Sequence, residues 1–203
     1  MEVNMKKIYL YSLFLIFSTL LFAYDSPFSN GEVDVKIGVS YPSSYSFTSG
    51  TYFLNTTSAS QPTFQVDFLR NFSQGNALGL GIGFFSVPFE NNNLSVGIYK
   101  ESSNFDLIPI YMIYRQNFSN IGDMTPYFSW KVGYTASLNH SEIIQYTGGL
   151  YGGIALGVTY QMLLLEVQYN IAQIAITSNS PTLNVSPNIY TMNGVSLVTG
   201  LKF

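Results

Sequence analysis

The chain has 203 residues, of which only 9% are charged and 16% are aromatic. This composition is too apolar for a disordered chain. It is also too weakly charged for an ordinary soluble domain, in which about 25% of residues are charged. Its net charge of −3 argues against a nucleic-acid-binding protein, which would present a clustered basic face. The absence of cysteine excludes a disulfide framework, a thiolate metal site and a cysteine nucleophile.

The first segment in chain order has the pattern of an export signal. Lys6 and Lys7 precede an uncharged stretch of about 16 residues, 8–23, which is rich in Leu, Ile, Phe and Tyr and ends at Ala23. A basic start, an apolar centre and a small final residue are typical of a secretory signal peptide. An uncleaved membrane helix is the alternative, although it needs about 20 apolar residues. We therefore predict a signal peptide at residues 1–23, cleaved near Ala23, and a mature domain at residues 24–203.

Eight later segments alternate apolar and polar side chains with a period of two, which indicates β-strands. The first, residues 32–41, reads E-V-D-V-K-I-G-V-S-Y, so Val, Ile and Tyr share one face while charged or small residues share the other. The other seven are residues 64–68, 78–84, 106–118, 128–135, 150–162, 165–171 and 195–203. Gly, Asn, Ser or a charge interrupts each apolar run after the signal, so we expect strands rather than membrane-spanning helices.

The connections between these segments alternate between short and long. The short ones are residues 73–76, residues 119–125 and a minimal turn near Met162. The longer ones are residues 42–62, 87–104, 139–147 and 177–188. Outer-membrane barrels show this asymmetry, with short periplasmic turns and longer extracellular loops. A strand that crosses an apolar band about 25 Å tall at about 40° needs about ten residues, which these segments supply.

Aromatic residues collect at both ends of the predicted strands. Those at the short-turn end, all on the outward face, are Phe72, Phe118, Phe128, Tyr160 and Phe203. Those toward the other rim are Tyr41, Phe84, Phe85 and Phe89. Tyr and Phe favour the headgroup level of a bilayer, so we predict two aromatic girdles on a membrane-spanning barrel.

Charged residues within the strands fall on the face opposite the apolar side chains. They are Lys36, Asp67, Arg115, Lys131 and Glu166, with Asp34 one inward step from Lys36. A Lys or Arg facing lipid near the midplane would cost about 2–4 kcal/mol, which favours inward placement. We predict that these six side chains form an ion-pair network that closes the periplasmic half of the lumen. Isolated charges solvated by lumenal water are the alternative.

The motifs that could carry chemistry are sparse. Gly79-x-Gly81-x-Gly83 resembles a phosphate-binding fingerprint but lies in a strand with no helix after it. The expected role of these glycines is therefore to face a narrow lumen or a crowded neighbour. His140, the single histidine, lies beside Ser141 and Glu142, a set that could support acyl chemistry. We do not expect catalysis there, because adjacent loop side chains seldom face one another. The acidic residues outside the strand centres, Asp25, Glu90, Glu101, Asp106 and Asp123, are dispersed, so no metal or cofactor is expected.

Three segments carry a resemblance to a known family: residues 109–118 (PIYMIYRQNF), 126–134 (PYFSWKVGY) and 194–203 (GVSLVTGLKF). The chain resembles the small eight-stranded outer-membrane barrels, such as the OmpA transmembrane domain and the opacity-type proteins. This implies an all-β fold, an eight-stranded antiparallel up-and-down transmembrane β-barrel. As a departure from some relatives, we expect no peptidoglycan-binding domain after the barrel. The resemblance also implies that Phe203, after Leu201, is the signal that the barrel-assembly machinery reads.

The expected function is that of a non-enzymatic barrel in the bacterial outer membrane, with a plugged lumen and a structural, surface-exposed or adhesin-like role. Its expected partners are outer-membrane lipids, the barrel-assembly machinery and surface ligands that bind the extracellular loops. No nucleic acid is expected among them. The alternatives are an outer-membrane enzyme that modifies lipid A or phospholipids, and a narrow channel. An interior of eight strands is just wide enough for side chains to fill, which disfavours the porin-like alternative.

Overall fold

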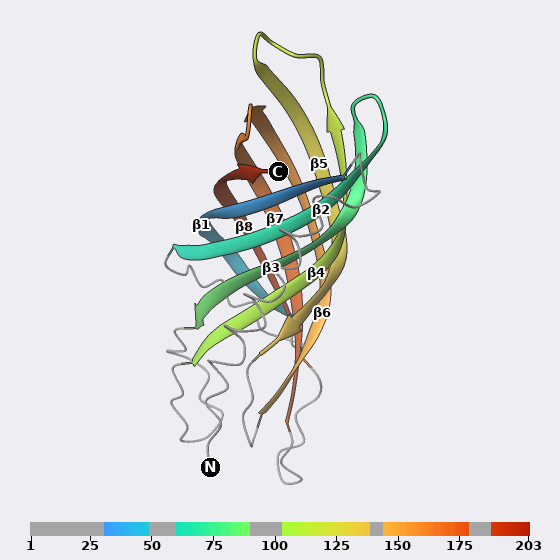
Figure 1. Ribbon diagram of the computed structural model, residues 1–203. Helices are drawn as coiled ribbons and strands as arrows, with labels where there is room; N and C mark the ends of the chain where they lie inside the picture. Colours follow the sequence, from blue (N-terminus) through green and yellow to red (C-terminus); the bar gives the residue numbers. More distant parts are fainter. Residues whose placement is uncertain (1–30, 49–59, 90–102, 139–143, 179–187) are drawn as a thin grey trace, which may run out of the picture. The chain divides into compact units, whose positions relative to one another are not determined.

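The computed structural model describes residues 31–48, 60–89, 103–138, 144–178 and 188–203, and the eight predicted strands are all present in it (Figure 1). The strands are β1 (Gly31–Thr48), β2 (Gln61–Ser73), β3 (Asn76–Phe89), β4 (Ser103–Asn117), β5 (Met124–Ser137), β6 (Ile144–Tyr160), β7 (Leu163–Ser178) and β8 (Asn188–Lys202). Most extend beyond the predicted segments, because pairing with at least one neighbouring strand continues after the apolar alternation ends. The predicted signal peptide and its cleavage site lie outside the described residues. No described helix is long and apolar enough to cross a membrane.

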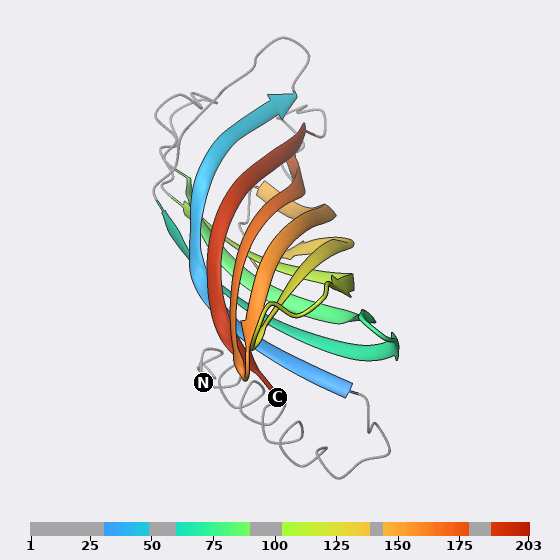
Figure 2. The same cartoon turned by 90° about the horizontal axis from the view of Figure 1, so that it is seen from above.

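The eight strands form a closed antiparallel barrel in which each strand pairs with the next and β8 pairs with β1. Figure 2 shows β1, in blue, beside β8, in red. A row of paired residues that starts at Gly31 of β1 passes through all the strands and returns to β1 at Tyr41, ten residues further on. At about 3.3 Å per residue and about 4.8 Å between strands, this shift tilts the strands by about 41° from the barrel axis.

Three tight turns lie at one end of the barrel, where β1 begins and β8 ends; we call this the short-turn end. Gln74 and Gly75 join β2 to β3, and Gln161 and Met162 join β6 to β7. Gly75 has a φ of 84°, which favours glycine, and Gln161 takes a φ of 54° at the other two-residue turn. The connection between β4 and β5 is closed by a bridge between Ile121 and Met124. The predicted short connections are therefore confirmed.

Successive side chains point alternately outward and into the barrel, as the period of two predicts. On β1, the outward Ile37 is 60% exposed, whereas the adjacent Lys36 is fully buried. The outer wall is apolar along every strand, with exposed residues such as Leu80, Met112 and Leu156. The buried residues thus fill the lumen, and the exposed ones form a surface that suits lipid.

The outward aromatic residues expected at the short-turn end are all on the outer wall. In the other predicted girdle, Tyr41 and Phe84 face outward, and the side chain of Phe89 lies outside the described residues. The prediction for Phe85 is wrong. Its side chain points inward and packs against buried lumen residues that include Leu107 and Ile174. Consecutive strand residues face opposite sides, so Phe84 and Phe85 cannot both face lipid.

Candidate functional site

The structure brings six charged side chains together inside the barrel, and we call them the lumen cluster. They are Asp34 and Lys36 of β1, Asp67 of β2, Arg115 of β4, Lys131 of β5 and Glu166 of β7. All six are at most 3% exposed. Five of the eight strands thus each direct charge into the same part of the lumen, because the inward positions of neighbouring strands converge on the barrel axis.

Lys36 lies at the centre of the lumen cluster. Its Nζ donates a hydrogen bond of 2.7 Å to Oε2 of Glu166 and lies 2.8 Å from Oδ2 of Asp67. Asp34 is a weaker neighbour, with its Oδ2 3.9 Å from the same Nζ. One ammonium group therefore links β1 to β2 and, across the lumen, to β7.

Arg115 forms the second centre. Its two terminal nitrogens donate to Glu32 and to Asp34, and its guanidinium lies 4.5 Å from the ring centroid of Tyr127. Glu32 in turn forms an ion pair of 2.7 Å with Lys202, the last residue of β8. The sequence reasoning missed Glu32 and Lys202. The alternation could have found Glu32, because it is two residues before Asp34 and therefore shares its inward face.

Lys131 is held by an amide and by a more distant carboxylate. Its Nζ donates to Oε1 of Gln65 at 2.8 Å and lies 3.5 Å from Oε1 of Glu166. Gln168 donates to that same Glu166 oxygen at 2.6 Å and to Oε1 of Gln65 at 3.0 Å. The two glutamines therefore extend the network from β2 across to β7.

Two tyrosines cross-link the lumen cluster, and glycines make room for them. The Tyr111 hydroxyl donates to Asp67 at 2.6 Å, and the Tyr127 hydroxyl donates to Glu166 at 2.7 Å. A Cβ at Gly81 would collide with the Tyr111 ring and the Asp67 carboxylate, and one at Gly157 would collide with Tyr127. The glycine-rich strand was expected to face a crowded neighbour. At Gly81 that neighbour is the Tyr111 ring.

The charges of this interior balance. Four carboxylates (Glu32, Asp34, Asp67 and Glu166) meet four cations (Lys36, Arg115, Lys131 and Lys202). Buried charges are tolerated only when they are paired and hydrogen-bonded. Each of these side chains takes part in at least one ion pair, although Oδ1 of Asp34 and Nε of Arg115 have no hydrogen-bond partner among the described residues. Its chemical capacity is to bind strands to one another and to occupy the space through which ions would pass.

No alternative chemical centre is found in the part of the chain that the structure describes. No group of three or more His, Asp or Glu side chains there could hold a metal ion. The loop set His140, Ser141 and Glu142 lies outside the described residues, as do Asp25, Glu90 and Glu101.

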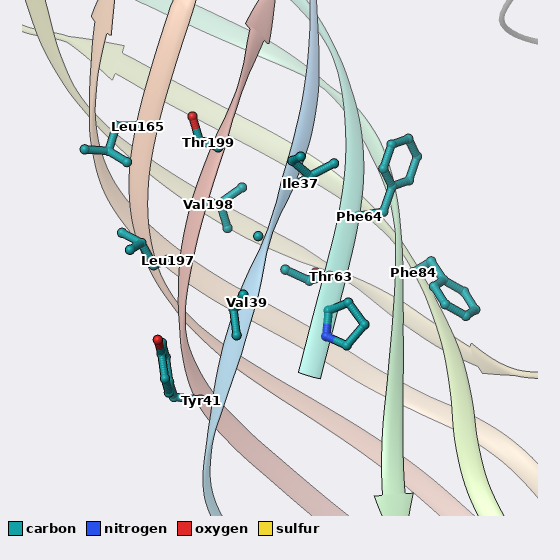
Figure 3. Close-up of a pocket in the computed structure, with 12 residues that line it drawn as sticks. Ile37, Val39, Tyr41, Thr63, Phe64, Phe84, Leu165, Leu197, Val198 and Thr199 are labelled. Carbon is teal, nitrogen blue, oxygen red and sulfur yellow. The ribbon is translucent and has the colours of Figure 1, made fainter. Parts of the chain in front are cut away.

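A shallow groove of about 620 Å³ lies on the outer wall rather than in the lumen (Figure 3). It follows the seam where β1 lies between β8 and β2. The side chains that rim it include Ile37, Val39, Phe64, Phe84 and Leu197. Because its lining is almost wholly apolar and opens outward, the groove belongs to the apolar wall and offers no polar binding site.

Leu201 and Phe203, the predicted assembly signal, lie at the seam that closes the barrel. Leu201 is paired with Val35 of β1 and with Leu163 of β7. The Phe203 amide donates to the Val33 carbonyl at 2.9 Å, and the Val33 amide donates back at 3.0 Å. Both side chains are exposed on the outer wall.

No protein-family model and no curated protein matches the chain. Solved structures do match. The outer membrane protein OprG from Pseudomonas aeruginosa has a TM-score of 0.53 at 14% identity, over 85% of this chain and 95% of that chain. The outer membrane protein AlkL in lipid bilayers has a TM-score of 0.51 at 13% identity, over 85% of this chain and 88% of that chain. Neisserial surface protein A has a TM-score of 0.49 at 15% identity, over 86% of this chain and 98% of that chain. The first two confirm the predicted fold class, a closed eight-stranded antiparallel barrel of the kind that small outer-membrane proteins adopt.

Proposed function

We propose that this protein is an integral barrel of the bacterial outer membrane that is closed to ions and serves as a structural, surface-exposed scaffold. The observation that carries the proposal is the lumen cluster, whose six charged side chains are buried and paired inside the barrel. We assign it no catalytic role, because the described lumen carboxylates are buried and paired with cations.

The outer wall supports membrane insertion. Its exposed side chains are Ile, Leu, Val, Met and aromatic residues on every strand, a surface that water would not tolerate. Phe72, Phe118, Tyr160 and Phe203 form an outward girdle at the short-turn end, where headgroups would lie. On this proposal the short turns face the periplasm, and the long connections reach the cell surface, where they can meet ligands.

The side chains that fill the lumen support the proposal that the barrel is closed to ions. An eight-stranded barrel has an interior that side chains can fill. Here the lumen cluster lies beside a second, apolar group of buried side chains that includes Leu107, Tyr151, Ile174 and Met192. An ion crossing the barrel would have to displace both paired charges and apolar side chains.

In planar lipid bilayers, we expect the refolded protein to give no steady conductance, because the paired side chains block the path of ions. The preparation should first show heat-modifiable migration in a gel, so that silence reports a folded barrel rather than a missing one. Stable unitary conductance from such a preparation would contradict the closed lumen and favour a narrow channel.

Phe203→Ala is expected to lower the amount of assembled protein in the outer membrane while leaving export unchanged. The last strand must pair with the first to close the barrel, and Phe203 lies at the end of that seam. Membrane fractionation with a heat-modifiability gel measures the result. Phe72→Ala is the matched control, since Phe72 is equally outward at the short-turn end but lies on β2. Equal assembly of the two variants would argue against recognition of the terminal aromatic by the barrel-assembly machinery.

A further inference from the structure

One cation of the described chain does not belong to the lumen. Lys36, Arg115 and Lys131 are buried in it, and Lys202 is paired with Glu32 at its short-turn end. Arg70 of β2 instead shares the outward face of Phe68 and Phe72, and its side chain is exposed. It makes no ion pair with any residue that the structure describes. A guanidinium group without an ion-pair partner among the described residues thus stands on an apolar outer wall.

The neighbours of Arg70 are apolar or lack a side chain. Across the sheet it is paired with Leu78 of β3 on one side and with Gly31 of β1 on the other. Gly31 has no side chain, and Leu78 supplies an apolar platform. No acidic side chain lies among these described outward neighbours, so no residue of the described barrel meets the charge of Arg70.

The level of Arg70 along the barrel follows from the strand register. The row of paired residues runs from Arg70 through Leu78 and Tyr114 to Trp130. This row rises toward the long connections, because it leaves β1 at Gly31 and returns at Tyr41. Arg70 therefore lies closer to the short-turn end than Tyr114 and Trp130 do.

Outward aromatic side chains contact one another along this row and reach down to Phe72, next to Arg70 on β2. The ring centroids of Phe72 and Tyr114 are 6.4 Å apart, and those of Tyr114 and Trp130 are 5.7 Å apart. The Tyr114 hydroxyl donates to Oδ1 of Asn76 at 2.7 Å, so the polar edge of this row points toward the short-turn end. Trp and Tyr settle where the hydrocarbon meets the headgroups, which puts Arg70 among the headgroups of the leaflet on that side.

We propose that Arg70 and the aromatic residues beside it form a docking surface for an anionic phospholipid of the leaflet at the short-turn end. The planar guanidinium matches a phosphate through two parallel hydrogen bonds, and an anionic headgroup supplies the countercharge that the described residues do not. The acyl chains would lie on Leu78 and Phe72. This inference rests on the proposed membrane location, and it adds a lipid class and a residue to it.

The test uses a tryptophan reporter beside Arg70. The Phe72→Trp, Trp130→Phe variant has its single tryptophan at position 72. In mixed vesicles, the quenching of its tryptophan fluorescence by brominated phosphatidylglycerol is compared with the quenching by brominated phosphatidylcholine. We expect an anionic preference of about fivefold at position 72. Arg70→Gln should reduce it to about one, and Arg70→Lys should retain part of it. The native Trp130 reporter, three strands away along the row, should show little preference and serves as the control.

The outcomes separate this inference from the proposed function. If neither brominated lipid quenches the reporter, the barrel does not face lipid and the membrane location itself fails. If both quench it but Arg70→Gln keeps the anionic preference, the docking surface is wrong while the membrane location stands. If inorganic phosphate abolishes the preference, Arg70 binds free phosphate and the lipid assignment is overturned. Heat-modifiable migration of each variant shows that all of them are folded.

Discussion

Lys36→Met is expected to lower the free energy of unfolding by about 3–5 kcal/mol, the cost of leaving buried charge without its partner. Lys36 is fully buried and lies within 2.8 Å of carboxylate oxygens on both Asp67 and Glu166. Methionine has nearly the same length and volume, so the lumen stays filled. Only the charge and its hydrogen bonds are removed. Glu166 keeps Lys131 at 3.5 Å, whereas Asp67 keeps no ion pair with a described residue. Urea unfolding of the protein in lipid vesicles measures the change.

A second substitution tests whether charge balance causes the loss. In Lys36→Met/Asp67→Asn the extra negative charge is removed, and the asparagine can still accept the hydrogen bond from Tyr111. We expect most of the lost stability to return, because a buried ion pair can be replaced by neutral groups at little net cost. Ile37→Met is the matched control on the outer wall, where Ile37 faces outward. If Lys36→Met were no more destabilising than Ile37→Met, the ion pairs would contribute nothing to holding the strands together.

The inward placement of the charged residues follows from the sequence because strand side chains have a strict period of two. Once Val35 and Ile37 face lipid, Asp34 and Lys36 must face the lumen, and the structure has this arrangement. The same rule corrects the expectation for Phe85, whose neighbour Phe84 already occupies the outward position. The number of strands and the ends at which the short turns lie are equally local features, and they were predicted from alternation and turn composition.

The choice of partners inside the lumen is not a local feature. Lys36 and Glu166 are 130 positions apart, and they meet because closure with a shift of ten residues brings β1 and β7 to the same depth. Alternation fixes the face of each side chain but says nothing about this shift. The tyrosines that bind Asp67 and Glu166 were missed for a related reason. In a chain with 16 tyrosines, a tyrosine next to apolar residues is as typical of a lipid interface as of a lumen.

The glycines show how the small and large residues of the lumen depend on each other. Tyr111 of β4 can reach Asp67 of β2 only by lying across β3, the strand between them. Gly81 is the β3 residue paired with both of them, and it leaves the space that the Tyr111 ring occupies. A side chain at this position would compete with the tyrosine for the same volume. The glycine-rich strand is therefore part of the lumen cluster's support, although it carries no charge.

Gly81→Ala is accordingly expected to cost about 1–3 kcal/mol of unfolding free energy, the usual penalty for overpacking a filled interior. The added methyl group would collide with the Tyr111 ring and the Asp67 carboxylate, so one of them must move and the hydrogen bond between them is lost or strained. Gly152→Ala is the matched control, because a Cβ there would meet a single backbone oxygen, that of Lys131, at an ordinary 3.8 Å. That control should be neutral or slightly stabilising, since alanine restricts the unfolded chain more than glycine does. Urea unfolding of both variants in lipid vesicles compares them, and equal stability would show that Tyr111 does not need the space above Gly81.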